Sequence, residues 1–447
     1  MNVWNRLTRN LRAFRGASAG NVAITFALAS LPIVGTVGFA VDYSHANSVK
    51  AAMQAALDST ALMLAKDAAT TNSGDLQTKA LSYFTALFNR PEANNIRITA
   101  SYTNTGGSKV LVNGTAAVPT AFLGVIGYNS INVNGSSTTA WGSERLRVAL
   151  ALDNTGSMAS DGKMTALKSA TKSLLTQLKN AAATNGDVYV SIIPFADDVN
   201  VSSSNYNATW IDWGDWDDDN TTTTCSGRRG RGCRTTTLSH NQWNGCVTDR
   251  GNSNTPDANN YDQKITAPGS SAQSKFPADQ SDNCPAQMKG LSYDWTSMNS
   301  LVDAMNPAGS TNQPIGLVWA WQSLVGGGPL VAPSKDSNYN YKEFVILMSD
   351  GLNTEDRWYG NGYSVSTDVD KRMYNASTSG SGTCANIKAT GVTIYSIQVN
   401  TGGDPTSTIM QNCASSADKF FEVKVAGDLG TVFTAIGTNL TQLRVAK

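Results

Sequence analysis

Acidic and hydroxyl side chains alternate in the segment DNTGS, which begins at Asp153 and follows the apolar run RVALAL. Three oxygen-bearing side chains at alternate positions of one turn can direct their oxygens to a single point. Hard cations such as Mg²⁺ bind carboxylate, hydroxyl and water oxygens together. Two further oxygen donors stand in the segments AGSTNQPIG and MSDG. These patterns predict a site for Mg²⁺, with Mn²⁺ and Ca²⁺ as alternatives, formed by Asp153, Thr155, Ser157, Thr311 and Asp350.

An α/β domain is predicted over residues 145–447, because apolar runs alternate there with helical stretches. The runs are RVALALD, DVYVSIIPF, EFVILMSD and VTIYSIQV, and the stretch MTALKSATKSLLTQLKN has helical periodicity. Continuous β-branched runs separated by helices indicate a parallel-rich sheet with helices on both faces, a Rossmann-like arrangement. Ligands gather at the carboxyl ends of such strands, where Asp153 and Asp350 stand.

The alternation stops between Phe195 and about Lys289, in a stretch rich in Asn, Thr, Asp, Gly and Trp. Because the pattern resumes afterwards, we interpret the stretch as an insertion into the α/β domain, at about 203–289. A structureless loop of that length would be unusual, and crosslinks would keep it compact. The insertion contains Cys225, Cys233, Cys246 and Cys284.

All six cysteines follow the apolar N-terminal segment. An even number of cysteines fits disulfides in an oxidising compartment, and the lack of a CxxC pair argues against a zinc site. The spacing does not determine the connectivity. We expect Cys384 to pair with Cys413 and the other four cysteines to cross-link the insertion.

Two other features of the insertion allow both a functional and a structural interpretation. The acidic segment GDWDDDN alternates like a calcium loop, but it lacks Gly at the sixth position and has Ser226 where an EF-hand has Glu. A solvated acidic turn is therefore expected. Trp210, Trp213 and Trp216 could anchor a partner, although tryptophans in a disulfide-rich insertion more often form a small local core.

A charge-free apolar segment extends from Asn21 to Val41. A helix needs about 20 apolar residues to cross the hydrocarbon core of a bilayer. Four arginines and no acid precede the segment, so the positive-inside rule predicts a cytoplasmic segment (1–20), a transmembrane helix (21–41) and an outward-facing remainder. A cleaved signal peptide is the alternative, since Gly38 and Ala40 resemble the small residues of a cleavage site; the length of the run favours retention.

Two smaller regions separate the apolar segment from the α/β domain. Residues 42–75 are Ala-rich with apolar residues near a helical stripe, which predicts a long helix, either a stalk or a partner-binding face. Residues 76–142 contain the β-branched runs IRITASY, KVLVNGTAAV and INVNGSSTTA, separated by Gly and Asn turn signals. A small α+β module without evident chemistry is predicted there.

Composition and motifs argue against several functions. Lys plus Arg and Asp plus Glu each number 34, so no global charge indicates nucleic acid binding. The two histidines, His45 and His240, are too few for a His-rich metal site. Asn154 interrupts the Asp-Thr-Gly motif of aspartic proteases, and Thr155 replaces the second Asp of haloacid dehalogenase-type phosphatases. We expect no enzymatic activity, no small-molecule substrate and no nucleic acid partner.

The motif DxTxS, a distant Thr and a strand-ending Asp-Gly together resemble the metal ion-dependent adhesion site (MIDAS) of von Willebrand factor A-type (vWA) domains. By this resemblance, Asp153, Thr155 and Ser157 form the first ligand group, Thr311 the second and Asp350 the third. The family usually has Ser where this chain has Thr155, and the hydroxyl group is preserved. The resemblance implies an α/β vWA fold.

The segment RGASAGNVAITFALASLPIVGTVGFAVDYSHANSVKAAMQAALDSTALMLA resembles the TadE/TadG-like start of bacterial Tad (Flp, tight-adherence) pilus-assembly proteins. Joined to a vWA domain, it is similar to the TadG type. The resemblance implies a single-pass inner-membrane anchor, a periplasmic body and a role in building or anchoring Flp pili. A prepilin has Glu five residues after its cleavage Gly. Counted from Gly20 that position is Thr25, so prepilin processing is not expected.

The expected function is non-catalytic capture of a pilus-machinery protein. A bound divalent cation with one open coordination position would take up a carboxylate of that partner. Two alternatives remain at the level of sequence. One is a periplasmic scaffold in which the metal only stabilises the fold, and the other is a surface adhesin.

Overall fold

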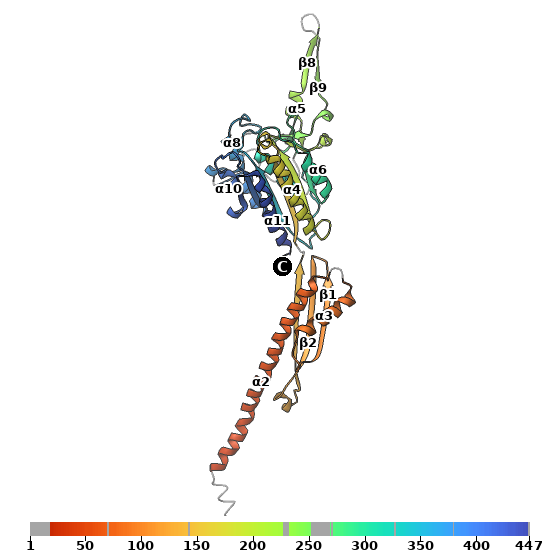
Figure 1. The fold of residues 1–447 in the computed structure, drawn as a ribbon, viewed down its shortest axis with the longest axis vertical. Coiled ribbons are helices and arrows are strands. Elements are labelled where there is room, and N and C mark those ends of the chain that lie inside the picture. The colour runs from red at the N-terminus through yellow and green to blue at the C-terminus, as the bar shows by residue number, and fades with distance from the viewer. Residues whose placement is uncertain are drawn as a thin grey trace, which may run out of the picture. The chain divides into compact units, whose positions relative to one another are not determined.

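The computed structural model describes residues 18–68, 71–141, 144–226, 232–251, 269, 271–325, 328–378 and 380–445 (Figure 1). Most of the predicted cytoplasmic segment, 1–17, lies outside the described residues, as does part of the insertion. The chain folds into two compact units, residues 1–141 and 142–446.

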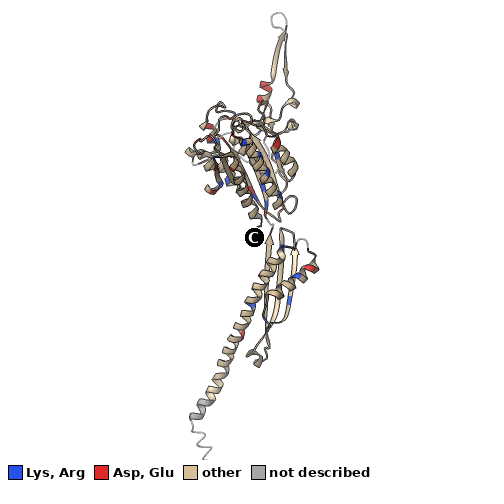
Figure 2. Ribbon diagram, in the orientation of Figure 1, with Lys and Arg blue, Asp and Glu red and all other residues tan. Residues whose placement is uncertain are grey.

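One helix, α2 (Ser18–Ala65), contains both the predicted membrane segment and most of the predicted Ala-rich helix. It is long and apolar enough, by length and composition, to cross a membrane. Its part before Asp42 carries no charged residue (Figure 2). The helix runs past Val41 without a break, because no Gly or Pro at that point interrupts its hydrogen bonding.

The Ala-rich part of α2 belongs to the core of the first unit. The unit also contains α3 (Ser73–Leu87), β1 (Asn94–Thr103), β2 (Ser108–Pro119), the short 3-10 helix η1 (Leu123–Ile126) and β3 (Ser130–Trp141). The strands form an antiparallel sheet in the order β1-β2-β3. The stripe of Val49, Met53, Leu57, Ala61 and Leu64 is buried against this sheet and α3.

The Ala-rich helix predicted at 42–75 and the α+β module predicted at 76–142 share one core within the first unit. Neither a bare stalk nor a partner face results, because the apolar face of the sheet covers the apolar stripe of the helix within the same chain. Two glycines, one on β2 and one on β3, allow the sheet to approach α2 closely. Gly114 and Gly135 face each other across β2 and β3, and a Cβ on Gly135 would lie 2.9 Å from Leu57 Cδ1.

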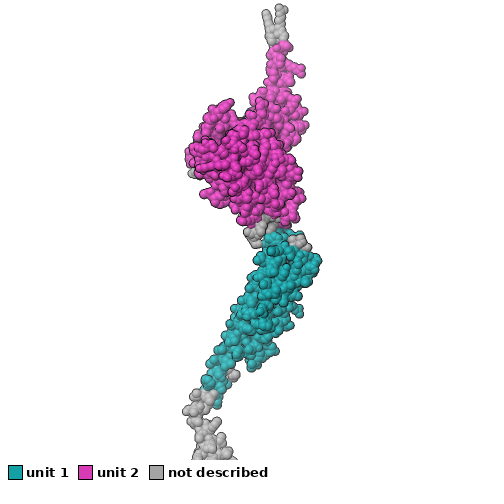
Figure 3. All heavy atoms as spheres, viewed as in Figure 1, with its two compact units in different colours: residues 1–141, 447 teal, residues 142–446 magenta. Residues whose placement is uncertain are grey.

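The second unit (Figure 3) is built on one long sheet. Its strand order is β15-β14-β13-β4-β5-β6-β10-β11-β7, with β12 also paired to β5. The five strands β15, β14, β13, β4 and β5 are mutually parallel. The strands are β4 (Glu144–Asp153), β5 (Val188–Phe195), β6 (Val199–Asn200), β7 (Ile211–Asp212), β10 (Cys246–Val247), β11 (Phe276–Asp279), β12 (Lys289–Ser292), β13 (Asn340–Ser349), β14 (Thr393–Val399) and β15 (Phe420–Val423).

Helices cover both faces of this sheet, as predicted. The helices are α4 (Lys163–Ala181), α5 (Gly214–Asp219), α6 (Trp295–Ala304), α7 (Gln313–Leu324), α8 (Thr367–Met373), α9 (Thr383–Ala389), α10 (Thr408–Cys413) and α11 (Leu429–Val445). Residues of α4, α6 and α11 share one core with one side of β4, and residues of α7, α9 and α10 share a second core with its other side. Alternate residues of β4 divide between these cores: Leu150 and Leu152 face one, Ala149 and Ala151 the other.

The insertion does not form a separate lobe. Its short strands β6, β10, β11 and β7 extend the edge of the main sheet, and β12 returns to pair with β5. Trp216 and Trp243 are buried, and Trp213 contacts both rings. The tryptophans of this region therefore contribute to a core. The acidic segment forms α5, in which Asp217 pairs with His240 at 2.7 Å rather than lining a calcium loop.

A two-stranded hairpin, β8 (Thr221–Ser226) with β9 (Gly232–Thr237), extends from the insertion (Figure 1). The disulfide Cys225–Cys233 joins a directly paired position of the two strands. The second disulfide of the insertion is Cys246–Cys284, and the third disulfide, Cys384–Cys413, connects α9 and α10. This last pairing is the one expected from the sequence.

Candidate metal centre

The five predicted ligands lie on three loops at one edge of the parallel sheet. Asp153 ends β4, and Asp350 follows the last residue of β13. These strands pair in parallel with Met348 opposite Leu152, so their carboxyl ends meet at the same edge. Thr311 lies just before α7, whose two buried faces fix its position against the sheet.

A hydroxyl of the first loop contacts the carboxylate of the loop after β13. Ser157 Oγ donates a hydrogen bond of 2.7 Å to Asp350 Oδ1, and Thr155 Oγ1 lies 3.0 Å from Ser157 Oγ. A Cβ placed on Gly351 would lie 3.9 Å from Thr311 Oγ1 and 4.0 Å from Ser157 Oγ. The Thr311 and Ser157 hydroxyls therefore lie on the same side of Gly351.

Asp153 is more deeply buried than this group of oxygens. Its Oδ1 accepts a hydrogen bond of 2.8 Å from Thr155 N–H, and its Oδ2 accepts one of 2.5 Å from Ser349 Oγ. The side chain is fully buried, and burial together with the charge of Asp350 raises the pKa of Asp153 to about 7. Ser349 was not predicted from the sequence. Its signal in the sequence is a hydroxyl directly after the apolar run FVILM.

A buried lysine also contacts the site. Lys163 Nζ, at the start of α4, donates to Asp350 Oδ2 at 2.5 Å, and the two side chains are 9% and 0% exposed. Lysine is almost never buried without a charged partner. Nothing in its residue type or spacing separated Lys163 from the other lysines of α4. The site therefore combines two carboxylates with one ammonium group.

The insertion positions the loops that carry Thr311 and Asp350. Asn312, next to Thr311, donates through Nδ2 to Asp249 Oδ2 at 2.9 Å. The N–H of Arg357, in the loop after Asp350, donates to the same oxygen at 3.2 Å, and its guanidinium donates to the carbonyl oxygens of Asp249 and Gly251. One buried carboxylate of the insertion thus connects two of the three loops.

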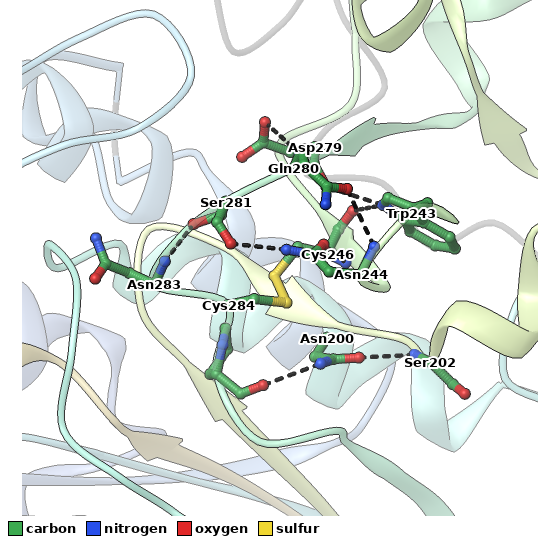
Figure 4. The surroundings of a disulfide bond; sticks show 11 residues. Asn200, Ser202, Trp243, Asn244, Cys246, Asp279, Gln280, Ser281, Asn283 and Cys284 are labelled. Carbon is green, nitrogen blue, oxygen red and sulfur yellow. Dashed lines mark hydrogen bonds between the residues drawn. A yellow bond between two sulfur atoms is a disulfide. The ribbon is translucent and has the colours of Figure 1, made fainter. Parts of the chain in front are cut away.

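Cys246, which lies three residues before Asp249, forms a disulfide with Cys284 (Figure 4). This bond holds the insertion in place. Trp243 Nε1 donates to the carbonyl oxygens of Cys246 and Asp279. Asn244 Nδ2 donates to the carbonyl oxygen of Ser281 at 2.7 Å. These bonds surround the disulfide with satisfied backbone groups, which makes this part of the insertion a rigid support for Asp249.

Beside this support lies an acidic cluster in which Asp198 and Asp249 are buried and Asp197 and Asp279 are half-buried. Asp197 Oδ1 accepts a hydrogen bond from Ser310 N–H, next to Thr311. Among the described residues, none donates a hydrogen bond to Asp198 Oδ2. Burial, a hydrogen bond to the Asp279 carboxyl and the neighbouring negative charges raise the pKa of Asp198 well above its ordinary value.

We predict that Asp198→Asn stabilises the protein at alkaline pH. A carboxyl whose pKa is raised by folding stabilises the native state below its unfolded pKa, and this stability is lost as pH rises toward the folded value. The melting temperature of the wild type should fall from about pH 4 to pH 8 more steeply than that of the variant. At pH 8 the variant should melt about 2–4 °C higher. Thermal scans with Asp218→Asn, an exposed acid of α5, as control would detect this; parallel curves for wild type and Asp198→Asn would contradict it.

The donor set fits a hard divalent cation. Among the described residues no group of three or more His, Cys, Asp or Glu side chains is placed to hold a metal ion, so cation binding here would depend on hydroxyl oxygens. Thr155, Ser157, Thr311 and Asp350 are the residues that would hold the ion, and Asp153 accepts hydrogen bonds from Thr155 N–H and Ser349 Oγ. Oxygen-only ligation with several neutral donors suits Mg²⁺, Mn²⁺ or Ca²⁺ better than softer metals.

The parallel order β15-β14-β13-β4-β5, the helices on both faces and the DxTxS, Thr and Asp loops at one edge define the second unit as a domain of the vWA class. Residues 20–67 match the family model described as "Tad: Putative Flp pilus-assembly TadE/G-like". The chain thus joins a segment that matches the TadE/G-like family model to a vWA-type domain.

Solved structures with a similar fold include several proteins of pili and threads. The pilus adhesin SpaC of Lactobacillus rhamnosus GG is 16% identical, with 80% of this chain and 36% of that chain covered and a TM-score of 0.35. The vWF domain of the type V pili tip protein Mfa5 of Porphyromonas gingivalis is 11% identical, with 69% and 98% covered and a TM-score of 0.35. Proximal thread matrix protein 1 of the mussel byssus, with a zinc-occupied MIDAS motif, is 14% identical, with 67% and 46% covered and a TM-score of 0.33.

At these identities the similarity concerns the fold alone. The chain spans about a third of the length of SpaC, at 36%. The comparison with curated proteins gave no match.

Proposed function

We propose that this chain is a membrane-anchored, periplasmic component of Tad/Flp pilus assembly, whose vWA domain binds a divalent cation and captures a partner protein of the pilus machinery through an acidic ligand. The match of residues 20–67 to the TadE/G-like family supports the pilus assignment. The contact of Ser157 Oγ with the Asp350 carboxylate, which joins two separate loops, is the observation that carries the metal-dependent part.

The anchor is the N-terminal part of α2. Its charge-free segment, 21–41, has the length that a helix needs to cross a bilayer. The arginines of the first 15 residues would remain on the cytoplasmic side, which would direct the remainder of the chain to the periplasm. Three disulfides in the second unit fit that oxidising compartment.

Charge determines the kind of ligand that such a site would prefer. Asp153 and Asp350 bring two negative charges and Lys163 brings one positive charge. A divalent cation held by this group would leave the site with a net charge of about +1, in a region that is largely buried. A carboxylate from a partner would neutralise that charge and occupy an open coordination position. The role is binding, and no catalytic step is proposed.

One observation favours a scaffold as the second candidate function. The ammonium group of Lys163 already contacts Asp350, so part of the negative charge is balanced by the chain itself. If the Lys163–Asp350 pair leaves too little charge at the site to attract an acidic partner, a bound metal would only stabilise the fold. The two candidates differ in whether the partner is released when the metal is removed from folded protein.

We predict that Thr311→Val reduces metal-dependent partner capture by at least about tenfold, because it removes one oxygen donor and preserves the side-chain shape. The full chain in nanodiscs would be tested against each Tad machinery protein, produced singly, in Mg²⁺ and in EDTA. Thr176→Val, on the exposed side of α4, is the matched control. Capture that persists unchanged in EDTA would refute the adhesion-type role, and a lower melting temperature in EDTA with undiminished capture would support the scaffold.

A further inference from the structure

The loop between β2 and β3 exposes a group of apolar side chains. Val125 is 85% exposed, Ile126 68%, Tyr128 67% and Phe122 47%. Soluble proteins rarely expose contiguous apolar patches of this kind unless the patch contacts a partner or a membrane. The sequence analysis found no chemistry in this module, and the vWA site does not use it.

Helix α2 holds this loop at a defined position. Both carboxylate oxygens of Asp42 accept backbone hydrogen bonds from it, at 2.9 Å from Ala121 N–H, 2.9 Å from Phe122 N–H and 2.7 Å from Leu123 N–H. One turn earlier, a Cβ on Gly38 would lie 2.5 Å from Phe122 Cβ. The phenyl ring therefore packs directly on the helix at a position where only glycine leaves space.

This position coincides with the end of the apolar segment of α2. Before Asp42 the helix exposes Ile33, Val34 and Val37 and carries no charge (Figure 2). Polar pairing begins just after it, where His45 Nε2 lies 3.6 Å from Glu92 Oε1. The sequence around the loop is also uncharged, since no Lys, Arg, Asp or Glu occurs between Lys109 and Glu144.

The backbone of the loop is suited to an apolar environment. Val125 N–H donates to the carbonyl oxygen of Phe122, Gly127 N–H to that of Gly124 and Tyr128 N–H to that of Leu123. The carboxylate of Asp42 takes three further N–H groups. Irregular backbone can enter a lipid environment only where its polar groups are satisfied within the protein.

We propose that the loop Phe122–Tyr128 inserts into the interfacial region of the membrane leaflet on the Asp42 side and forms a second membrane contact beside α2. The proposal rests on the membrane-spanning role of α2 given above. Tyr128 and Tyr43 suit this level, because tyrosines are enriched where a bilayer meets water. Two contacts instead of one would fix the rotation of the first unit against the membrane surface, which a single helix cannot do.

A lipid surface fits this patch better than a protein does. A protein interface has a polar rim around its apolar centre, whereas this loop is uncharged and adjoins an apolar helix segment of membrane-spanning length. The depth at which Asp42 fixes the loop is the depth at which the helix would leave the bilayer. Because the exposed apolar loop adjoins the apolar segment of α2, lipid is the partner that this surface fits.

The test uses the full chain in liposomes with an environment-sensitive nitrobenzoxadiazole (NBD) label at Val125→Cys. The six native cysteines form three disulfides, so the new thiol alone reacts, and the 85% exposed side chain tolerates the label. Ile33→Cys, within the apolar segment, reports on the anchor. Thr105→Cys, an exposed position in the turn before β2, is the control in water, about 40 Å away along a 12-residue strand.

We expect lipids with nitroxide groups near the head group to quench the label at 125, at a depth of about 5–10 Å below the boundary of head groups and acyl chains. The label at 33 should be quenched most by nitroxides deeper in the acyl chains, and the label at 105 by neither. Quenching at 33 without quenching at 125 would overturn the loop insertion and leave the anchor intact. The absence of quenching at 33 would overturn the anchor and, with it, this inference.

Discussion

Asp350→Asn should weaken Mg²⁺ binding by at least about 100-fold, since even residues outside the ligand set typically change metal affinity by about 10–100-fold. The asparagine keeps an oxygen that can accept the bond from Ser157 Oγ. It removes the charge of the one carboxylate that contacts both a predicted hydroxyl ligand and Lys163. Calorimetric titration of Mg²⁺ into the full chain in nanodiscs would measure the change.

Two controls make this result interpretable. Asp303→Asn, an acid whose side chain is 60% exposed and pairs with Lys172, should bind Mg²⁺ like the wild type. Asp350→Asn leaves Lys163 buried without its partner, which is destabilising in itself. The double variant, Asp350→Asn with Lys163→Met, removes both charges of the pair and therefore keeps the net charge of the site unchanged. If the folded double variant bound Mg²⁺ as tightly as Lys163→Met alone, Asp350 would not be a ligand.

The five candidate ligands could be named from the sequence because each belongs to a local pattern, and their role as ligands stays a prediction. Asp153 and Asp350 end apolar runs, and parallel strands bring their carboxyl ends to one edge whatever the connections between them. Thr311 stands in a Gly-containing loop that opens a helix. The fold class followed from the same alternation of strands and helices.

The residues that support the site could not be predicted, because their roles depend on contacts between distant segments. Asp249 contacts Asn312 across 63 positions of sequence, and Lys163 contacts Asp350 across 187. Neither Asp249 nor Lys163 differs in residue type from the exposed aspartates and lysines elsewhere in the chain. The surface that covers the Ala-rich helix could not be predicted for the same reason: its stripe predicts a buried face, but the sequence does not say which surface buries it.

Lys163→Met is expected to change metal binding and partner binding in opposite directions. A unit charge about 5 Å away contributes roughly 3 kcal/mol at an effective dielectric constant of 20. Removing the ammonium group should therefore tighten binding of the divalent ion by at least about 100-fold. The same change lowers the net charge of the loaded site from about +1 to 0, so capture of an acidic partner should weaken although more metal is bound.

Lys179→Met, at the exposed end of α4, is the matched control and should alter neither binding step. Titration of Mg²⁺ and capture of the partner would be measured on the same nanodisc preparations. Tighter metal binding with undiminished capture would mean that the ligand is not anionic. Weaker metal binding would mean that Lys163 orients Asp350 for the metal rather than competing with it, because an ammonium group can hold a carboxylate in place as well as neutralise it.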